Sequence, residues 1–86
     1  MLKIVLADDE KKILLLLQKL IDWERLGYEI VGTANDGLRA LELVRELHPD
    51  LLITDVRMPG CSGIELIQQA KELHPDLHFI IISGYR

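Results

Sequence analysis

Several features that define other protein classes are missing from this sequence. Cys61 is the only cysteine, which excludes an internal disulfide and is typical of a reducing compartment. The longest purely aliphatic run, residues 13–17, is far shorter than the roughly 20 residues that a helix needs to cross a bilayer. The chain does not open with a basic stretch, a long apolar segment and a cleavage site, so secretion is not expected. We expect a soluble, cytoplasmic protein without membrane contact.

Clustered positive charge is also missing. The formal net charge is -4 and the Lys and Arg residues are scattered, whereas a nucleic-acid surface needs clustered cations to contact phosphates. Any DNA binding is therefore expected outside these residues. The chain has 86 residues, of which 49% are apolar and 28% charged, and this composition fits one small globular domain. Because most domains are longer, a missing piece is expected.

Hydrophobic periodicity predicts an alternation of strands and helices. Strands are expected over residues 2–7, 28–34, 50–54 and 79–82. Helices are expected over residues 10–25, after the N-cap residues Asn35 and Asp36, and after Ser62, which stands with Glu65 in the relation of a capping box. Strict alternation requires right-handed crossovers. The sequence therefore predicts an α/β fold with a doubly wound, mainly parallel sheet.

The last predicted strand, residues 79–82, carries no charge. An uncovered apolar strand at the edge of a sheet pairs with other chains unless something covers it. We therefore expect the natural protein to continue beyond Arg86. We expect these residues either to self-associate through this strand, for example as a homodimer, or to be less stable than a longer chain.

A six-residue repeat marks two joins between a helix and the next strand. Residues 46–51 read ELHPDL, and the same letters recur at residues 72–77. The His can interact with the carbonyl end of a helix, the Pro cannot continue the helix, and the Leu begins the strand. A structural role is therefore favoured for His48 and His74, and also for His78, because none of them lies at the carboxyl ends of the strands.

Acidic residues follow two of the apolar strands. Asp8 and Asp9 come directly after the first strand, and Asp55 comes directly after the third. The carboxyl ends of parallel strands open at one edge of the sheet, so the three carboxylates are expected in one crevice. Three such groups within roughly 5 Å repel one another by several kcal/mol unless a cation joins them. Mg²⁺ is the natural candidate.

Each acidic residue also has a structural explanation. Asp8 or Asp9 could cap the first helix, and Asp55 could form an Asx turn before Pro59. Their joint occurrence at one sheet edge, together with a fourth strand that ends in Ser83, favours a functional site.

Several segments of the sequence together resemble the receiver domain of bacterial two-component response regulators. The resemblance rests on residues 4–10, residues 51–59, Gly63 and residues 80–84, and it spans the whole chain. It implies a flavodoxin-like fold with strand order 2-1-3-4, in which the fifth strand and the last helices are missing. Residues 1–86 would then be the N-terminal part of a receiver domain.

The resemblance also implies a role for individual residues. Asp55 is similar to the phosphoacceptor, which also contacts Mg²⁺, Asp9 to a direct ligand of that ion, and Asp8 to a ligand through water. The backbone carbonyl of Arg57 supplies a further oxygen, and Ser83 resembles the switch hydroxyl that bonds the phosphoryl group. Carboxylate and carbonyl oxygens suit the octahedral coordination of Mg²⁺. The lysine that the family carries after its fifth strand has no counterpart here.

The implied activity is signalling rather than enzymatic turnover. The phosphoryl donor is a phosphohistidine of a sensor histidine kinase, and the family adds self-phosphorylation and autodephosphorylation. Residues 21–28 and 83–86 are similar to receivers joined to helix-turn-helix transcription regulators of the arabinose-regulator type. A DNA-binding output domain is therefore expected outside this chain.

Three other functions fit the sequence less well. A haloacid-dehalogenase-like phosphatase needs the pattern D-x-D after its first strand, whereas this chain has Asp8, Asp9 and Glu10 there. A flavin or nucleotide carrier needs a Gly- or Ser/Thr-rich phosphate loop at the same place, where two carboxylates would repel phosphate. A receiver-like interaction module that is never phosphorylated is the third alternative, and the acidic triad argues against it.

Overall fold

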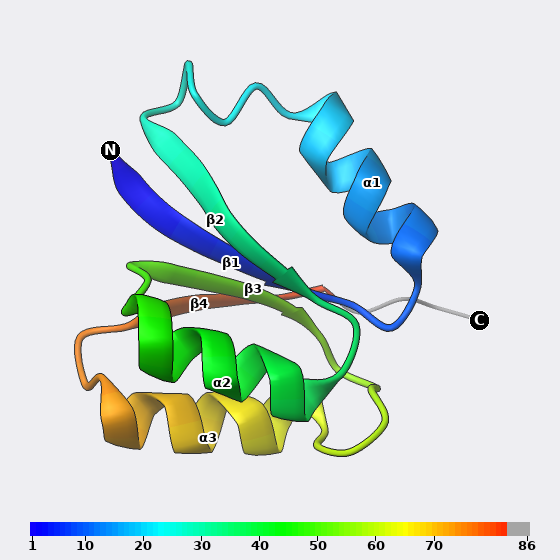
Figure 1. The fold of residues 1–86 in the computed structure, drawn as a ribbon, viewed down its shortest axis with the longest axis vertical. Coiled ribbons are helices and arrows are strands. Elements are labelled where there is room, and N and C mark those ends of the chain that lie inside the picture. Colours follow the sequence, from blue (N-terminus) through cyan, green and yellow to red (C-terminus); the bar gives the residue numbers. More distant parts are fainter. Residues whose placement is uncertain (83–86) are drawn as a thin grey trace.

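The computed structural model describes residues 1–82, which form one four-stranded sheet and three helices (Figure 1). In chain order the elements are β1 (Leu2–Ala7), α1 (Lys11–Leu20), β2 (Tyr28–Ala34), α2 (Gly37–Leu47), β3 (Leu51–Asp55), α3 (Gly63–Leu73) and β4 (His78–Ile82). The strands pair in the order β2-β1-β3-β4, and every pairing is parallel. The predicted fold class and strand order are therefore confirmed.

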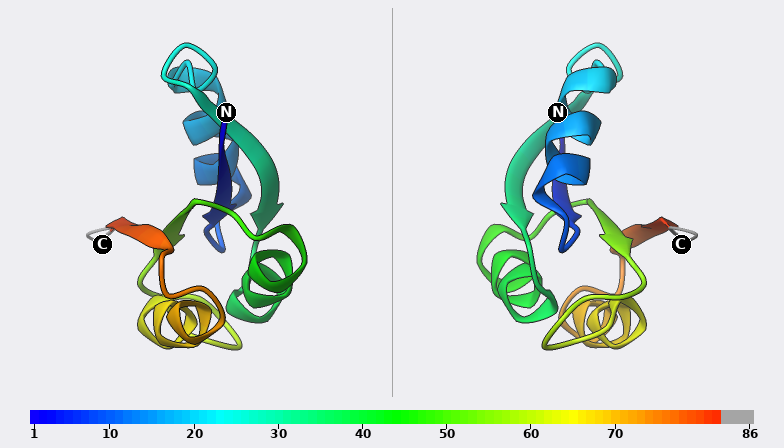
Figure 2. Two further views of the ribbon diagram at one scale, coloured as in Figure 1. Left: turned by 90° about the vertical axis from the view of Figure 1, so that its left-hand side faces the viewer. Right: turned by 90° about the vertical axis from the view of Figure 1, so that its right-hand side faces the viewer.

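The helices lie on both faces of the sheet. Helix α1 covers one face, and helices α2 and α3 lie side by side on the other (Figures 1 and 2). Alternate residues of β1 supply the two cores, because Ile4 and Leu6 pack on the α1 side while Val5 and Ala7 pack on the α2–α3 side. This two-sided burial explains why β1 is a continuous apolar run rather than an alternating one.

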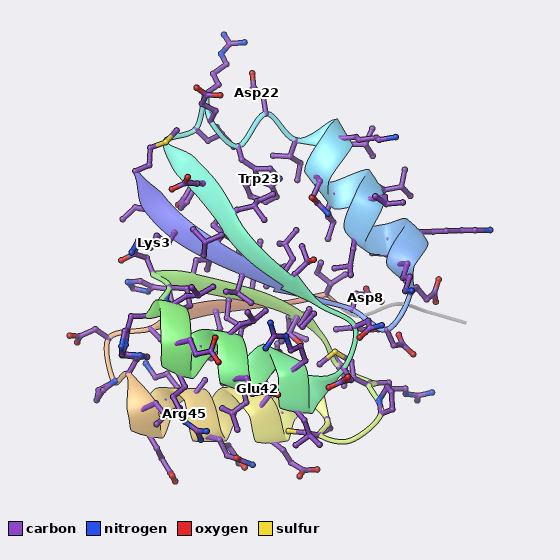
Figure 3. The ribbon with its side chains drawn as sticks, in the orientation of Figure 1. Lys3, Asp8, Asp22, Trp23, Glu42 and Arg45 are labelled. Atoms are coloured by element: carbon purple, nitrogen blue, oxygen red, sulfur yellow. The ribbon has the colours of Figure 1, made fainter. Side chains whose placement is uncertain are left out.

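The first helix is shorter than predicted. It ends at Leu20, whereas the periodicity predicted residues 10–25. The indole of Trp23 donates to the carbonyl of Leu17 (2.9 Å), and the Asp22 side chain accepts from the Arg25 amide (3.3 Å). These side chains belong to the connection between α1 and β2 (Figure 3), and they bond the Leu17 carbonyl in the last turn of α1 and an amide in the connection itself. The prediction was wrong because apolar spacing continued past the point where these local bonds compete with the helix.

The other two helices begin where the sequence predicted. The Asp36 carboxylate accepts from the Arg39 amide (2.8 Å) at the start of α2. The Ser62 hydroxyl accepts from the Glu65 amide (3.2 Å) at the start of α3, and it lies 3.3 Å from the Glu65 carboxylate. Both are N-cap interactions of the predicted kind.

The repeat forms the joins for which it was predicted. Leu51 begins β3, but Leu77 is a buried residue that precedes β4, which begins at His78. His48 and His74 are the C-cap residues of α2 and α3, and their amides donate to the carbonyls of Val44 and Ala70. The bounds of β3 and β4 each differ from the predicted bounds by one residue.

Strand β4 is an edge of the sheet within the described residues, because its one pairing there is with β3. It is also apolar and open to solvent: Phe79 is 43% exposed and Ile80 is 50% exposed. Among residues 1–82, no helix combines the length and apolar character that crossing a membrane would require.

Candidate phosphoacceptor and metal site

Strand β1 brings two carboxylates to the carboxyl edge of the sheet. Asp8 follows the last residue of the strand, and its amide donates to the carbonyl of Ala34 at the end of β2 (3.0 Å). The Asp8 side chain accepts from the Glu10 amide (2.9 Å) and is 3% exposed, whereas Asp9 is exposed. The N-cap of α1 is Glu10, without a side-chain cap. The alternative of Asp8 or Asp9 as that N-cap is therefore not what the structure shows.

Strand β3 brings the third carboxylate. Asp55 is the last residue of β3 and is 7% exposed. Its Oδ1 atom accepts from the amide of Val56 (2.7 Å), so one of its two oxygens is held by the backbone.

Thr54 supports Asp55 from the strand. It is fully buried, and its hydroxyl donates to the carbonyl of Asp55 (3.0 Å). The apolar run that ends at Thr54 predicts only that this residue lies in a strand. The signal that could have singled it out is a polar residue in an otherwise apolar run, directly before the acidic residue.

Gly63 lets α3 begin directly against the end of β3. Its amide donates to the carbonyl of Val56 (2.8 Å). A Cβ at this position would lie 2.1 Å from the carbonyl oxygen of Asp55, which is far inside van der Waals contact. The absence of a side chain at Gly63 therefore sets how closely the loop after β3 folds back on the acidic residue.

The three carboxylates converge. One oxygen each of Asp8, Asp9 and Asp55 can be chosen so that all lie within 4.8 Å of one another. Asp8 lies at the end of β1 beside the start of α1 (Figure 3). Carboxylate oxygens are hard ligands, and the exposed Asp9 leaves one side open to water, which suits Mg²⁺ because this ion keeps several waters. The donor set therefore fits the ion that the sequence predicts.

Arg57 and Ser83 are the two other predicted site residues. Arg57 is exposed in the loop after β3 and lines a pocket together with Asp9, Met58 and Ser62. Ser83 lies outside the described residues. The individual roles of Asp8, Asp9, Asp55, Arg57 and Ser83 stay predictions.

Cys61 belongs to the packing around the site. It is 4% exposed, lies in the core on the α2–α3 side, and its backbone carbonyl occupies the space beside Gly37. Burial raises the pKa of its thiol above the ordinary value of 9.0, and the nearby Glu65 carboxylate raises this pKa further. The thiol is therefore protonated near neutral pH and acts as a small apolar group.

Comparison with known proteins identifies the family. The response regulator receiver domain matches residues 4–86 of this chain. The transcriptional regulatory protein YesN of Bacillus subtilis is 44% identical over 85 residues, which are 99% of this chain and 23% of YesN. This chain thus spans about a quarter of that curated relative.

Similar solved structures come from the same family. The REC domain of the response regulator AraT from Geobacillus stearothermophilus is 39% identical with a TM-score of 0.94, over 98% of this chain and 65% of that one. The two-component transcriptional regulator AraC from Clostridium phytofermentans is also 39% identical, with a TM-score of 0.90, over 99% of this chain and 68% of that one. The chain belongs to the receiver domains of two-component response regulators, and the relatives named here include transcriptional regulators.

Proposed function

We propose that Asp55 accepts a phosphoryl group from a phosphohistidine of a sensor histidine kinase, with Mg²⁺ held by Asp8, Asp9, Asp55 and the backbone carbonyl of Arg57. The observation that carries this proposal is the convergence of three carboxylate oxygens within 4.8 Å at the carboxyl edge of the sheet. Membership of the receiver family supports it.

Phosphoryl transfer requires the protein to position the reacting groups and to neutralise charge, rather than to transfer protons. The bound ion would neutralise charge on the phosphoryl oxygens. The Val56 amide holds Asp55 Oδ1, so the other carboxylate oxygen attacks phosphorus in line. A P–O bond forms as the P–N bond to the donor imidazole breaks, and the bonding electron pair returns to the imidazole ring. Water later hydrolyses the acyl phosphate.

Phosphorylation would replace the single negative charge of the Asp55 carboxylate with a phosphoryl group that carries about 1.5 to 2 negative charges, and the Ser83 hydroxyl would contact the new oxygens. We propose that residues 1–86 are the N-terminal part of a receiver domain. The 65% coverage of the AraT REC chain supports a partial domain. The output we propose is transcriptional control in the cytoplasm through a DNA-binding domain elsewhere in the protein, as the name of the relative YesN suggests.

We also propose that the open edge of β4 allows association with a second copy. The support is the exposure of Phe79 and Ile80 on a strand with one described neighbour. An unpaired apolar edge is a template for further strand pairing.

The test of phosphoacceptance uses the full-length protein that carries this chain, incubated with Mg²⁺ and a small phosphodonor. Intact-mass measurement should show one added phosphate that hydroxylamine removes, as expected for an acyl phosphate. Asp55→Asn should abolish the addition. The matched control is Asp76→Asn, an exposed carboxylate at the opposite edge of the sheet, which should leave the addition unchanged. Phosphate retained by Asp55→Asn would refute the assignment.

A further inference from the structure

The two copies of the repeat meet in space. His48 is the C-cap residue directly after α2, His74 is the C-cap residue directly after α3, and these helices lie side by side (Figure 1). Nδ1 of His48 and Nε2 of His74 are 2.5 Å apart, and the rings form a T-shaped pair with centroids separated by 4.3 Å. Two imidazoles from separate helices therefore point one ring nitrogen each at the same small region. This region is at the amino edge of the sheet, opposite the acidic cluster.

The surroundings favour a cation there. Both histidines are C-cap residues, so the negative ends of two helix dipoles lie beside the rings. Each copy of the repeat adds two exposed acidic residues, which are Glu46, Asp50, Glu72 and Asp76. The basic residues that precede the two copies are Arg45, which is exposed, and Lys71, whose ammonium group donates to the carbonyls of Pro75 (2.7 Å) and Leu77 (3.1 Å).

We propose that His48 Nδ1 and His74 Nε2 together bind a transition-metal dication such as Zn²⁺, Ni²⁺ or Cu²⁺. Neutral imidazole nitrogen is a preferred ligand of these ions and a poor one for Mg²⁺. Metal–nitrogen bonds of about 2.0–2.1 Å require the two nitrogens to separate to roughly 3 Å. His48 is exposed and His74 is half-buried, so small rotations of the side chains provide this separation. Water completes the coordination.

Besides this small rotation, binding needs a change of tautomer. In the contact seen here, one of the two facing nitrogens carries the shared proton. When the metal binds, that ring instead carries its proton on its other nitrogen, and both facing nitrogens present lone pairs. The metal then links the C-terminal ends of α2 and α3. The site is therefore chemically and spatially distinct from the Mg²⁺ site at the carboxyl edge.

The experiment is a calorimetric titration of this chain with Ni²⁺ in excess Mg²⁺, which occupies the carboxylate site. We expect one bound Ni²⁺ per chain and a higher unfolding temperature, because the ion binds the native state. His48→Asn and His74→Gln should each weaken binding by about tenfold or more. Asn is chosen at position 48 because this residue has φ 48°, a left-handed conformation that Asn tolerates and Ala does not.

The matched control is His78→Gln, which removes the third histidine of the chain outside the pair. It should bind Ni²⁺ as the parent does. Circular dichroism shows whether each variant is folded, and the imidazole proton signals of the parent, titrated with diamagnetic Zn²⁺, should shift for residues 48 and 74 alone. Absence of Ni²⁺ binding, or equal binding by the parent and both pair variants, would overturn the proposal.

Discussion

The carbonyl oxygen of Asp55 fills the space that a side chain at Gly63 would need. A Cβ there would approach this oxygen to 2.1 Å, and the Asp55 carbonyl also accepts from the buried Thr54 hydroxyl. Gly63 at the start of α3 is therefore in direct contact with the Asp55 backbone at the end of β3. Since the Asp55 carboxylate is the proposed phosphoacceptor, the position of the acceptor depends on a glycine whose own role is steric.

Gly63→Ala should destabilise the protein by about 1–3 kcal/mol and weaken Mg²⁺ binding, because the new methyl group pushes the Asp55 backbone out of place. Chemical denaturation and a Mg²⁺ titration measure these two effects. Gly32→Ala is the matched control, since its Cβ would meet only the ends of the Leu43 and Leu47 side chains at 3.2 and 3.3 Å. It should change stability by less than about 1 kcal/mol. Equal effects of the two substitutions would contradict this account.

Asp9→Asn should stabilise the metal-free protein by up to about 1 kcal/mol, because it removes one of three converging negative charges at an exposed position. The same substitution should reduce the rise in unfolding temperature that Mg²⁺ causes in the parent. Thermal unfolding with Mg²⁺ and with a chelator checks both expectations. Asp22→Asn, in the connection before β2, is the control for removal of an exposed charge. An unchanged Mg²⁺ response in Asp9→Asn would argue against Asp9 as a ligand.

Stability should fall as the pH rises above about 9. The folded pKa of Cys61 is raised above its ordinary value of 9.0, chiefly by burial, so the unfolded chain releases this proton more readily. The stabilising contribution is therefore complete below the unfolded pKa and is lost as the pH rises through the folded one. Denaturation of the parent and of Cys61→Ala at pH 7 and pH 10 isolates the effect from other titrating groups. The difference between the two proteins should shrink at high pH, and a constant difference would contradict the assignment.

Ile80→Lys should reduce self-association of this chain, because a charge on an edge strand opposes pairing with another chain. Ile80 is 50% exposed, so the folded state should tolerate the substitution. Sedimentation velocity over a range of concentrations measures the change. Leu26→Lys adds the same charge at another residue that is 62% exposed and lies away from β4, and it should leave association as it is. A parent that stays monomeric throughout would remove the basis for the prediction.

The fold could be predicted from the sequence because its signals are local and repeated. Apolar runs ended by acidic, Gly or Pro residues gave the strands, and Asp36 and Ser62 marked the starts of two helices by cap chemistry that the structure confirms. The end of α1 could not be predicted in the same way. It depends on the indole of Trp23 reaching back to the carbonyl of Leu17, a contact that apolar spacing does not reveal.

The sequence alone was enough to place Asp8, Asp9 and Asp55 at one edge of the sheet, because the carboxyl ends of parallel strands share one edge. How closely residues distant in the chain approach one another became clear only from the three-dimensional packing. It showed the 4.8 Å convergence of the carboxylates, the space at Gly63 and the pairing of His48 with His74. These distances depend on how β1, β3 and the helices pack together. A linear pattern specifies the direction and face of each element, whereas the spacing between elements is set by the volume of the side chains between them.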